Sequence, residues 1–225
     1  MLDIVQELHS REVHQHHIEG HNGIYAQVGK RLFDLCLALL LLPLILPIIA
    51  ILAILARRDG GEAFFGHKRV GQDGVSFRCW KIRSMVPDAA ARLKKHLDEN
   101  PEAAAEWARD HKLTNDPRIT RFGNFIRKTS LDELPQILNV LKGEMTFVGP
   151  RPVITDELPK YGNKVQHYLA QKPGITGLWQ VSGRNDVSYD ERVDMDVAYL
   201  ERRSLMLDIN IIARTALAVL GTTGR

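Results

Sequence analysis

The stretch LCLALLLLPLILPIIAILAILA, residues 35–56, decides the fold class because it holds 22 consecutive residues without a charge. A helix of about 20 apolar residues spans the hydrocarbon core of a bilayer. A secretory signal peptide has a shorter apolar core and a cleavage site of small residues, whereas Arg57 and Arg58 follow directly here. A buried helix of a soluble protein is rarely so uniform. This segment therefore predicts that the protein resides at a membrane.

Two features of the apolar run argue against a straight crossing. Lys30-Arg31 precede it and Arg57-Arg58 follow it, and the positive-inside rule favours the cytoplasm for both ends. Pro43 and Pro47 lie one turn apart inside it, and each removes a backbone donor and clashes with the preceding turn. Residues 30–58 are therefore predicted to form a re-entrant helix that breaks at these prolines and leaves by the face it entered. A kinked span is the alternative.

The polar residues 1–29 are predicted to form an N-terminal extension. They include the closely spaced histidines His14, His16, His17 and His21. Histidines at such spacing can bind a metal, but no cysteine or carboxylate cluster completes a site, so a surface extension is preferred. At the start of the apolar run, Asp34 is expected to lie at the membrane interface and to pair with a nearby arginine.

Composition and charge exclude several classes of protein. A hydrophobic content of 44% and a charged content of 25% are typical of a folded chain, and a net charge of +3 does not indicate a nucleic-acid partner. Cys36 lies in the apolar run and Cys79 between charged residues, so no disulfide is predicted. Basic residues gather in two clusters that suit a phosphate-rich ligand or an anionic membrane surface, a solvated face being the alternative. The clusters are Lys68, Arg69, Arg78, Lys81 and Arg83, and Arg118, Arg121, Arg127 and Lys128.

The chain after the apolar run, residues 59–225, is predicted to form one small α+β domain that is mostly helical. Aromatic and β-branched residues on both sides of Gly71-Gln72-Asp73-Gly74 predict a β-hairpin. The glycine-rich residues 172–185 predict a loop. The final helix has a broad apolar surface and is expected to contact the membrane interface. Helices are predicted twice within residues 87–111 and once each over 119–128, 130–141, 188–201 and 207–220.

Two adjacent carboxylates, Asp132 and Glu133, open the helix predicted at residues 130–141. The pattern Ser130-x-x-Glu133 matches a capping box, in which Ser130 is the N-cap and Asp132 meets the positive end of the helix dipole. Ser188-x-x-Glu191 repeats this pattern elsewhere. A functional interpretation uses the same geometry, because a helix N-terminus attracts phosphate and a carboxylate can attack it as a nucleophile. The local pattern alone favours the structural role.

Five stretches carry a resemblance to a known family. From Lys30 to about Leu220 the chain resembles the bacterial monotopic phosphoglycosyl transferases, and it is most similar to the undecaprenyl-phosphate galactose and glucose phosphotransferases that initiate exopolysaccharide or O-antigen synthesis. It matches their membrane and catalytic region, and we expect a short form without a preceding multi-span domain. The stretches are KRLFDLCLALLLLPLILP, GHKRVGQDG, WKIRSM, NDPRITRFGNFIRKTSLDELPQILNVLKGEMTFVGPRP and KPGITGLWQVSGRND.

The resemblance implies an enzyme that transfers hexose-1-phosphate from a UDP-sugar, UDP-galactose or UDP-glucose, to undecaprenyl phosphate and releases UMP. It implies that Asp132 attacks the β-phosphate to form a covalent aspartyl-phosphosugar, with Glu133 assisting and Mg²⁺ bound by the pair. It also implies a location on the cytoplasmic face of the bacterial inner membrane, in contact with membrane lipids. A homodimer and downstream glycosyltransferases are the expected protein partners.

The resemblance also assigns residues that bind the donor. In the GPRP turn, Arg151 is the foremost candidate to contact the uridine or its phosphates, flanked by Pro150 and Pro152. Weaker phosphate candidates, which structural ion pairs would equally explain, are Arg118, Arg127, Lys128 and Arg184.

One position departs from the family pattern. The family breaks its membrane helix at a Ser-Pro pair, whereas Leu46-Pro47 stands here, and Pro43 adds a second proline. An alternative function, a membrane-bound nucleotide-sugar hydrolase with an aspartyl nucleophile and water as acceptor, stays open at this point. A membrane-anchored interaction module without activity is disfavoured because both the acidic pair and GPRP are intact.

Overall fold

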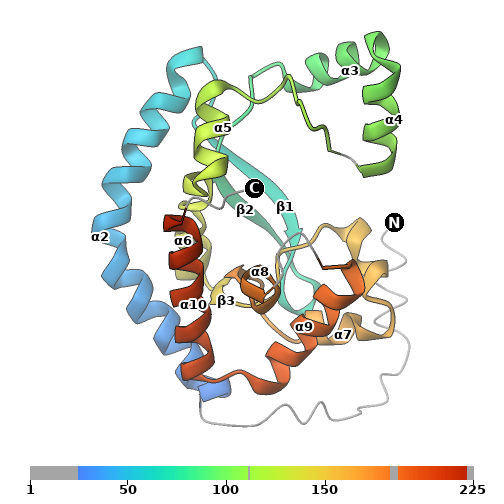
Figure 1. The fold of residues 1–225 in the computed structure, drawn as a ribbon. Coiled ribbons are helices and arrows are strands. Elements are labelled where there is room, and N and C mark those ends of the chain that lie inside the picture. Colours follow the sequence, from blue (N-terminus) through green and yellow to red (C-terminus); the bar gives the residue numbers. More distant parts are fainter. Residues whose placement is uncertain (1–24, 111, 183–186, 222–225) are drawn as a thin grey trace.

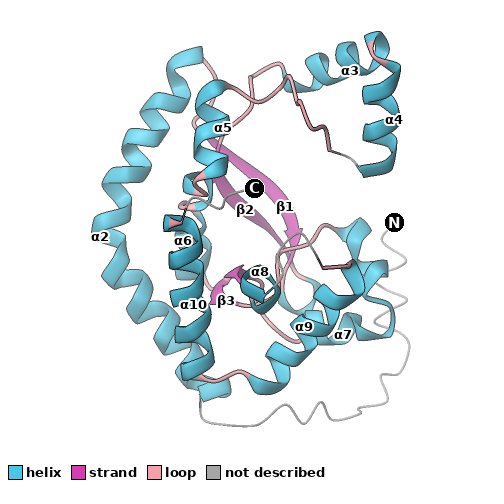
Figure 2. Ribbon diagram, in the orientation of Figure 1, coloured by secondary structure: helices cyan, strands magenta, loops and turns pink. Residues whose placement is uncertain are grey.

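The computed structural model describes residues 25–110, 112–182 and 187–221. Over these residues the chain is mostly helical and has two small two-stranded sheets, which confirms the α+β class (Figure 2). The predicted histidine group, His14, His16, His17 and His21, lies outside the described residues. After a short π-helical turn, Tyr25–Gly29, the elements are α2 (Lys30–Ala56), β1 (Phe64–Val70), β2 (Ser76–Ile82), α3 (Ala89–Glu99), α4 (Pro101–Asp110), α5 (Arg121–Lys128), a 3₁₀ turn (Leu131–Glu133), α6 (Gln136–Lys142), β3 (Thr146–Val148), an irregular 3₁₀ segment (Thr155–Lys164), α7 (Val165–Leu169), β4 (Gly174–Thr176), α8 (Leu178–Ser182), α9 (Tyr189–Arg202) and α10 (Leu205–Leu220).

Helix α2 forms a long arc along one side of the molecule (Figure 1). It stays helical through Pro43 and Pro47, so the predicted break of the helix at these prolines is wrong. A proline in a long helix produces a bend as readily as an end, and the loss of one hydrogen bond at each proline is consistent with the curvature. By length and composition, this is the one helix among the described residues able to cross a membrane.

A narrow inner face of α2 packs on the domain, and the rest of its surface is apolar and exposed. The buried apolar residues are Ala38, Ile49, Leu52 and Ala56. Exposed apolar surface of this size indicates contact with lipid or a partner rather than water. The large apolar residues exposed on α2 are Leu32, Leu39, Leu40, Leu44, Leu46, Ile48, Ile51, Ile54 and Leu55.

The N-terminal end of α2 is bound to the domain by buried polar groups. Asp34 is 2% exposed and accepts hydrogen bonds from Thr146 Oγ1 at 2.5 Å and from the Phe147 N–H at 3.1 Å. Lys30 donates to Asp34 at 3.1 Å and lies 2.8 Å from Asp208 of α10. The cation paired with Asp34 is therefore a lysine and not the arginine we expected. Arg31 instead donates to the Val140 and Leu141 carbonyls in the last turn of α6.

The C-terminal end of α2 is bound to the same domain through Arg83, which follows β2. Arg83 donates to the Ala56 carbonyl at 2.5 Å and to Asp59 Oδ2 at 2.9 Å. It also donates to the Met85 carbonyl. One side chain thus connects the end of α2, the turn after it and the segment after the hairpin. Both ends of the apolar helix are therefore fixed to one polar domain.

The predicted hairpin is confirmed and is joined to α6 by one buried amide. Strands β1 and β2 pair antiparallel, with Phe65 opposite Lys81 and His67 opposite Cys79. Asn139 of α6 is fully buried, and its Oδ1 accepts from the Trp80 N–H at 3.1 Å. Its Nδ2 donates to the Arg78 carbonyl at 2.7 Å and to Glu144 at 2.6 Å. Asn139 therefore sets the position of β2 relative to α6.

One strand of the second sheet lies in a segment that was predicted to be a loop. Residues 172–185 contain β4 and α8, and β4 pairs parallel with β3. A Cβ atom on Gly174 would lie 2.2 Å from the Gly149 nitrogen, so only glycine permits this approach. Elements of three to five residues depend on tertiary pairing more than on local propensity, which explains the wrong prediction.

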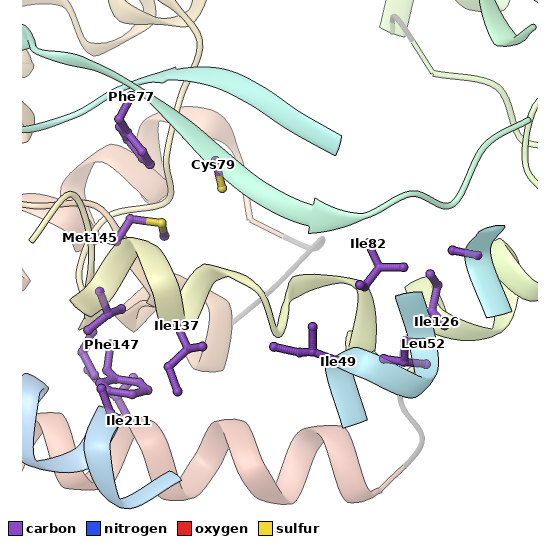
Figure 3. Packing of buried hydrophobic residues seen from close by; sticks show 14 of the residues in the cluster. Ile49, Leu52, Phe77, Cys79, Ile82, Ile126, Ile137, Met145, Phe147 and Ile211 are labelled. Atoms are coloured by element: carbon purple, nitrogen blue, oxygen red, sulfur yellow. The ribbon is translucent and has the colours of Figure 1, made fainter. Parts of the chain in front are cut away.

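A single apolar core joins the apolar helix α2 to the domain (Figure 3). Its members come from α2, the hairpin, α5, α6, β3 and α10, and include Ile49, Leu52, Phe77, Ile82, Ile126, Ile137, Met145, Phe147 and Ile211. A second cluster of Val70, Val153, Tyr161, Tyr168 and Val193 lies under the irregular 3₁₀ segment and α7. Cys36 is exposed, Cys79 is buried, and both are free thiols, so the prediction of no disulfide between them is confirmed.

The predicted helices are largely confirmed. Pro101 is the first residue of α4, and α5, α9 and α10 match the predicted ranges within three residues. Gly143, with φ of 83°, ends α6 as expected. Helices α3 and α4 form an arm that projects from the rest of the domain (Figure 1).

Replacing Asn139 by alanine is expected to destabilise the protein. The Trp80 N–H and the Arg78 carbonyl would lose their partners in a buried place, which costs about 2–4 kcal/mol in total. Thermal unfolding of the purified protein in detergent measures this as a fall in Tm. Asn124→Ala, an exposed asparagine on α5, is the matched control. Equal Tm values for the two variants would contradict the assigned role of Asn139.

Candidate active site

Asp132 and Glu133 lie in the 3₁₀ turn Leu131–Glu133 between α5 and α6. Ser130 has a left-handed backbone, with φ of 56° and ψ of 15°, and its side chain makes no cap hydrogen bond. Helix α6 begins only at Gln136, after Pro135. The capping box predicted at Ser130, and with it a helix starting there, is therefore wrong. The same pattern at Ser188 is a capping box, with hydrogen bonds in both directions between Ser188 and Glu191.

The turn places the two carboxylates against Lys81 of the hairpin. Lys81 Nζ donates to Glu133 Oε1 at 2.6 Å and lies 3.8 Å from Asp132 Oδ2. The Asp132 side chain is 10% exposed and that of Glu133 35% exposed, so Asp132 is the enclosed member of the pair. This contact explains the failed capping box, because Glu133 is held by Lys81 and not by the backbone N–H of Ser130.

The surroundings of Asp132 bring the pKa of its carboxyl group closer to neutral pH. The pKa of Asp132 is raised to about 6, chiefly by burial; the neighbouring Glu133 also raises this pKa, whereas Lys81 and Arg127 lower it. Above pH 6 the carboxylate is therefore ionised but poorly solvated, a state that favours nucleophilic attack. Ser130, at the start of this turn, adopts a positive φ that serine rarely adopts, and such strain often accompanies functional sites.

Positive charges from separate elements gather around the hairpin near this turn. The Cys79 thiol lies within electrostatic reach of Lys81, Glu133, Arg69 and Arg151. Burial raises the pKa of Cys79 to about 11, so it stays a neutral thiol and is no nucleophile at neutral pH. The hairpin therefore brings Arg151 of the GPRP turn toward the same side of the molecule as the acidic pair.

The GPRP turn carries three of the other predicted site residues and packs against β4. Arg151 is exposed while Pro150 is fully buried, and Pro152 is half-buried. The Gly149 N–H donates to the Thr176 carbonyl at 2.9 Å, and the Gly174 N–H donates to the Pro150 carbonyl at 2.8 Å, so the turn is held against β4.

The basic residues before the acidic pair differ in their surroundings. Arg127 and Lys128 lie in the last turn of α5, and Arg127 acts electrostatically on Asp132. The Arg118 side chain donates three hydrogen bonds to Asp116, at 2.8, 3.1 and 2.6 Å, and its guanidinium carbon lies 4.9 Å from the centroid of the Trp107 ring. The structure thus groups Arg127 with Asp132 and engages Arg118 in an ion pair. Arg184 lies outside the described residues.

Lys81 is the residue of this site that the sequence analysis missed as a partner of Asp132 and Glu133. It was assigned to a basic cluster, but nothing in its spacing connects it with carboxylates about fifty positions later in the chain. The link arises only because β2 lies beside the 3₁₀ turn. The motif WKIRSM, which contains Lys81, was the one available sign that this residue matters. It indicated the family but gave Lys81 no role.

The acidic pair fits the kind of magnesium site in which the protein supplies only one or two carboxylates. Among the described residues there is no group of three or more histidine, cysteine or acidic side chains arranged to hold a metal. Mg²⁺ commonly takes only one or two carboxylates from the protein and completes its shell with water and substrate phosphates. Asp132 and Glu133 suit such a site, with Lys81 balancing the same negative charge.

Comparisons with known proteins agree with the motifs. A profile of the family described as bacterial sugar transferase matches residues 25–222. A UDP-galactose-lipid carrier transferase of Erwinia amylovora is 55% identical over 195 residues, which are 87% of this chain and 41% of the relative. An undecaprenyl-phosphate galactose phosphotransferase of Salmonella typhimurium is 53% identical over 195 residues, again 87% of this chain and 41% of the relative. The exopolysaccharide production protein ExoY of Sinorhizobium fredii is 45% identical over 193 residues, 85% of each chain.

The chain thus spans about two fifths of the length of the first two relatives and most of the third. The family match covers nearly every described residue, including the apolar helix, the hairpin, the acidic pair and the GPRP turn. The family resemblance is confirmed: this chain belongs to the bacterial sugar transferases.

Proposed function

We propose that this protein transfers hexose-1-phosphate from a UDP-sugar to undecaprenyl phosphate and releases UMP, the first membrane step of exopolysaccharide, capsule or O-antigen synthesis. The observation that carries the proposal is the buried carboxylate of Asp132 beside Glu133 and Lys81, within a chain of this family. UDP-galactose is the favoured donor because the names of two relatives contain galactose, and UDP-glucose is the alternative.

Asp132 is the proposed nucleophile. One of its carboxylate oxygens attacks the β-phosphorus of the UDP-sugar, and a bond forms between that oxygen and phosphorus. The bond from the β-phosphorus to the bridging oxygen breaks, and the electron pair leaves with UMP. An oxygen of undecaprenyl phosphate then attacks the same phosphorus, the aspartyl–phosphorus bond breaks, and Asp132 returns as a carboxylate. Formation of the covalent intermediate divides one difficult displacement into two.

The neighbours of Asp132 support this role by their charge. Lys81, 3.8 Å away, and Arg127 stabilise its ionised form and attract an anionic diphosphate. Glu133 is more exposed and is positioned to hold a cation or to orient the acceptor phosphate. A Mg²⁺ ion held by Asp132 and Glu133 would neutralise charge on the transferred phosphoryl group. Arg151 is the proposed contact for the uridine or its phosphates.

The attachment of both ends of α2 supports a re-entrant, monotopic arrangement. Asp34 binds Thr146 and Phe147 at one end, and Arg83 binds Ala56 at the other. A polar domain bound to both ends lies on one side of the membrane, so the helix enters and leaves by that side. We place the domain on the cytoplasmic face of the inner membrane, where the basic flanks are favoured.

The first test is Asp132→Asn, which removes the nucleophile. We expect UMP release from the UDP-sugar to fall at least about 10³-fold, as for loss of other catalytic nucleophiles. With the unchanged protein and no undecaprenyl phosphate, release stops near one equivalent per protein. The control is Asp98→Asn, an exposed aspartate on α3. Equal continuous rates with and without acceptor would favour the hydrolase and contradict the transfer.

The second test is the pH dependence of UMP release. A pKa of about 6 for Asp132 means that activity is full above this value and falls as the pH drops through it, because the protonated carboxyl is a poor nucleophile. Lys81 lowers this pKa, so Lys81→Met is expected to raise it. The acid limb of the pH–activity curve, where activity falls with falling pH, then moves to higher pH. Lys81→Arg, which keeps the charge, restores the original limb. An acid limb that does not move in Lys81→Met would contradict the assigned interaction.

The third test concerns topology. Single cysteines replace the exposed Val28 and Arg58 in a Cys36→Ser background, where Cys79 stays buried. A membrane-impermeant maleimide is expected to label both positions in inside-out vesicles and neither in intact spheroplasts. If each position is labelled from a different side, the helix is a span and the monotopic arrangement is wrong.

A further inference from the structure

A cavity of about 220 Å³ lies at the N-terminal end of α2, away from the acidic pair. It opens where α2, the hairpin turn, β3, the segment after α7 and the end of α9 meet. Gln72 of the hairpin turn lines it, whereas Lys81 lies at the other end of β2. The extended residues from Ser76 to Lys81 span roughly 17 Å, so the cavity is separate from the site at Asp132.

The cavity is lined by more positive than negative charge. Its cations are Lys30, Arg31, Lys172 and Arg203, and its one acidic lining residue is Asp34. Asp34 already accepts hydrogen bonds from Lys30, Thr146 and the Phe147 backbone. Asp208, which pairs with Lys30, likewise accepts from Tyr25 and Tyr199. Both carboxylates thus already have hydrogen-bond partners, and of the other three cations Lys172 feels the negative charge of Asp34.

The surroundings of Arg31, Lys172 and Arg203 favour the binding of an anion in the cavity. Arg31 donates hydrogen bonds to two backbone carbonyls, which are neutral and do not offset its positive charge. The Nε atom of Arg203 is buried and has no hydrogen-bond partner. Burial lowers the pKa of Lys172, and the positive charge of Arg31 lowers it further. Cations held this close together repel one another, and an anion between them would remove that repulsion.

Gln171 presents to the cavity a buried acceptor that a hydroxyl group of a ligand could satisfy. This residue lines the cavity and is 4% exposed, and its Oε1 atom is buried without a partner. Its Nε2 atom donates to the His167 and Asp196 carbonyls, which fixes the amide so that oxygen is the free atom. A buried acceptor without a donor costs free energy. A ligand hydroxyl would satisfy it.

The mouth of the cavity adjoins apolar surface. Val28 is exposed in the π-helical turn before α2, and Leu32 is exposed in the first turn of α2. Leu205 and Met206 are exposed at the start of α10, close after Arg203. These ends of α2 and α10 lie side by side (Figure 1), joined by Lys30 and Asp208. This arrangement suits a molecule whose phosphate lies among the cations while its hydrocarbon lies against the helices.

We infer that this cavity binds a phosphate ester that carries hydroxyl groups, and that the headgroup of an anionic glycerophospholipid is its source. The phosphate lies among Arg31, Lys172 and Arg203, and a glycerol hydroxyl donates to Gln171 Oε1. The bound lipid fixes the depth at which the N-terminal end of α2 enters the membrane. This inference depends on the membrane location of α2 and not on chemistry at Asp132.

Native mass spectrometry of the delipidated full chain in detergent tests the inference with two lipids and one soluble ester. Phosphatidylglycerol is expected to bind at least about tenfold more tightly than phosphatidylcholine of the same chain length, because only the former combines net negative charge with free hydroxyls. Lys172→Gln combined with Arg203→Gln is expected to abolish this preference, and Lys172→Gln alone to reduce it. Arg202→Gln, an exposed neighbour outside the cavity, is expected to keep it.

Glycerol 1-phosphate distinguishes a lipid from a soluble ligand. If it binds with the same dependence on Lys172 and Arg203 while the lipids show no preference, the cavity is a phosphate site for a soluble ester, and the lipid assignment is overturned. Equal binding of both lipids to the unchanged protein, without binding of glycerol 1-phosphate, would overturn the inference entirely. So would an undiminished lipid preference in the double variant that still unfolds at the Tm of Arg202→Gln.

Discussion

Asp34 accepts three hydrogen bonds in a place that excludes water, and the rest of the structure depends on that contact. An apolar helix has no reason of its own to stay against a polar domain, because lipid solvates it equally well. Burial of a carboxylate that is satisfied by Thr146, Phe147 and Lys30 makes detachment costly, since it would leave charged groups unpaired. Arg83 has the same function at the other end. The domain is thereby held against both ends of the apolar helix.

The same hairpin that ends in Arg83 supplies Lys81 to the acidic pair. Asn139 fixes β2 to α6, and α6 follows the turn that carries Asp132, so the distance from lysine to carboxylate is set by backbone contacts rather than by flexible side chains alone. Burial raises the pKa of Asp132 while Lys81 opposes it, and the balance lies just below neutral pH. A carboxylate in this balance is ionised yet weakly hydrated, as a nucleophile toward phosphorus should be.

Local patterns predicted most helices and the hairpin because their signals lie within a few residues. The apolar run, the Gly71–Gly74 turn and the Ser188 capping box are examples. The same reasoning failed at Ser130, where Lys81 binds Glu133 and the helix starts later. It also missed β4 and α8, which exist because Gly149 and Gly174 approach closely. Asp132 was identified through the family motif, and its partner Lys81 was not, because their contact is a property of the fold.

The central claim is that Asp132 becomes covalently bonded to the sugar phosphate. Hydroxylamine converts an aspartyl phosphate to a stable hydroxamate, and trypsin releases residues 129–142, whose only carboxylate side chains are Asp132 and Glu133. After incubation with UDP-sugar alone, sequencing of this peptide by mass spectrometry should find the hydroxamate on Asp132, in an amount that matches the UMP released. UMP release with an unmodified peptide, or with the mark on Glu133, would contradict the account.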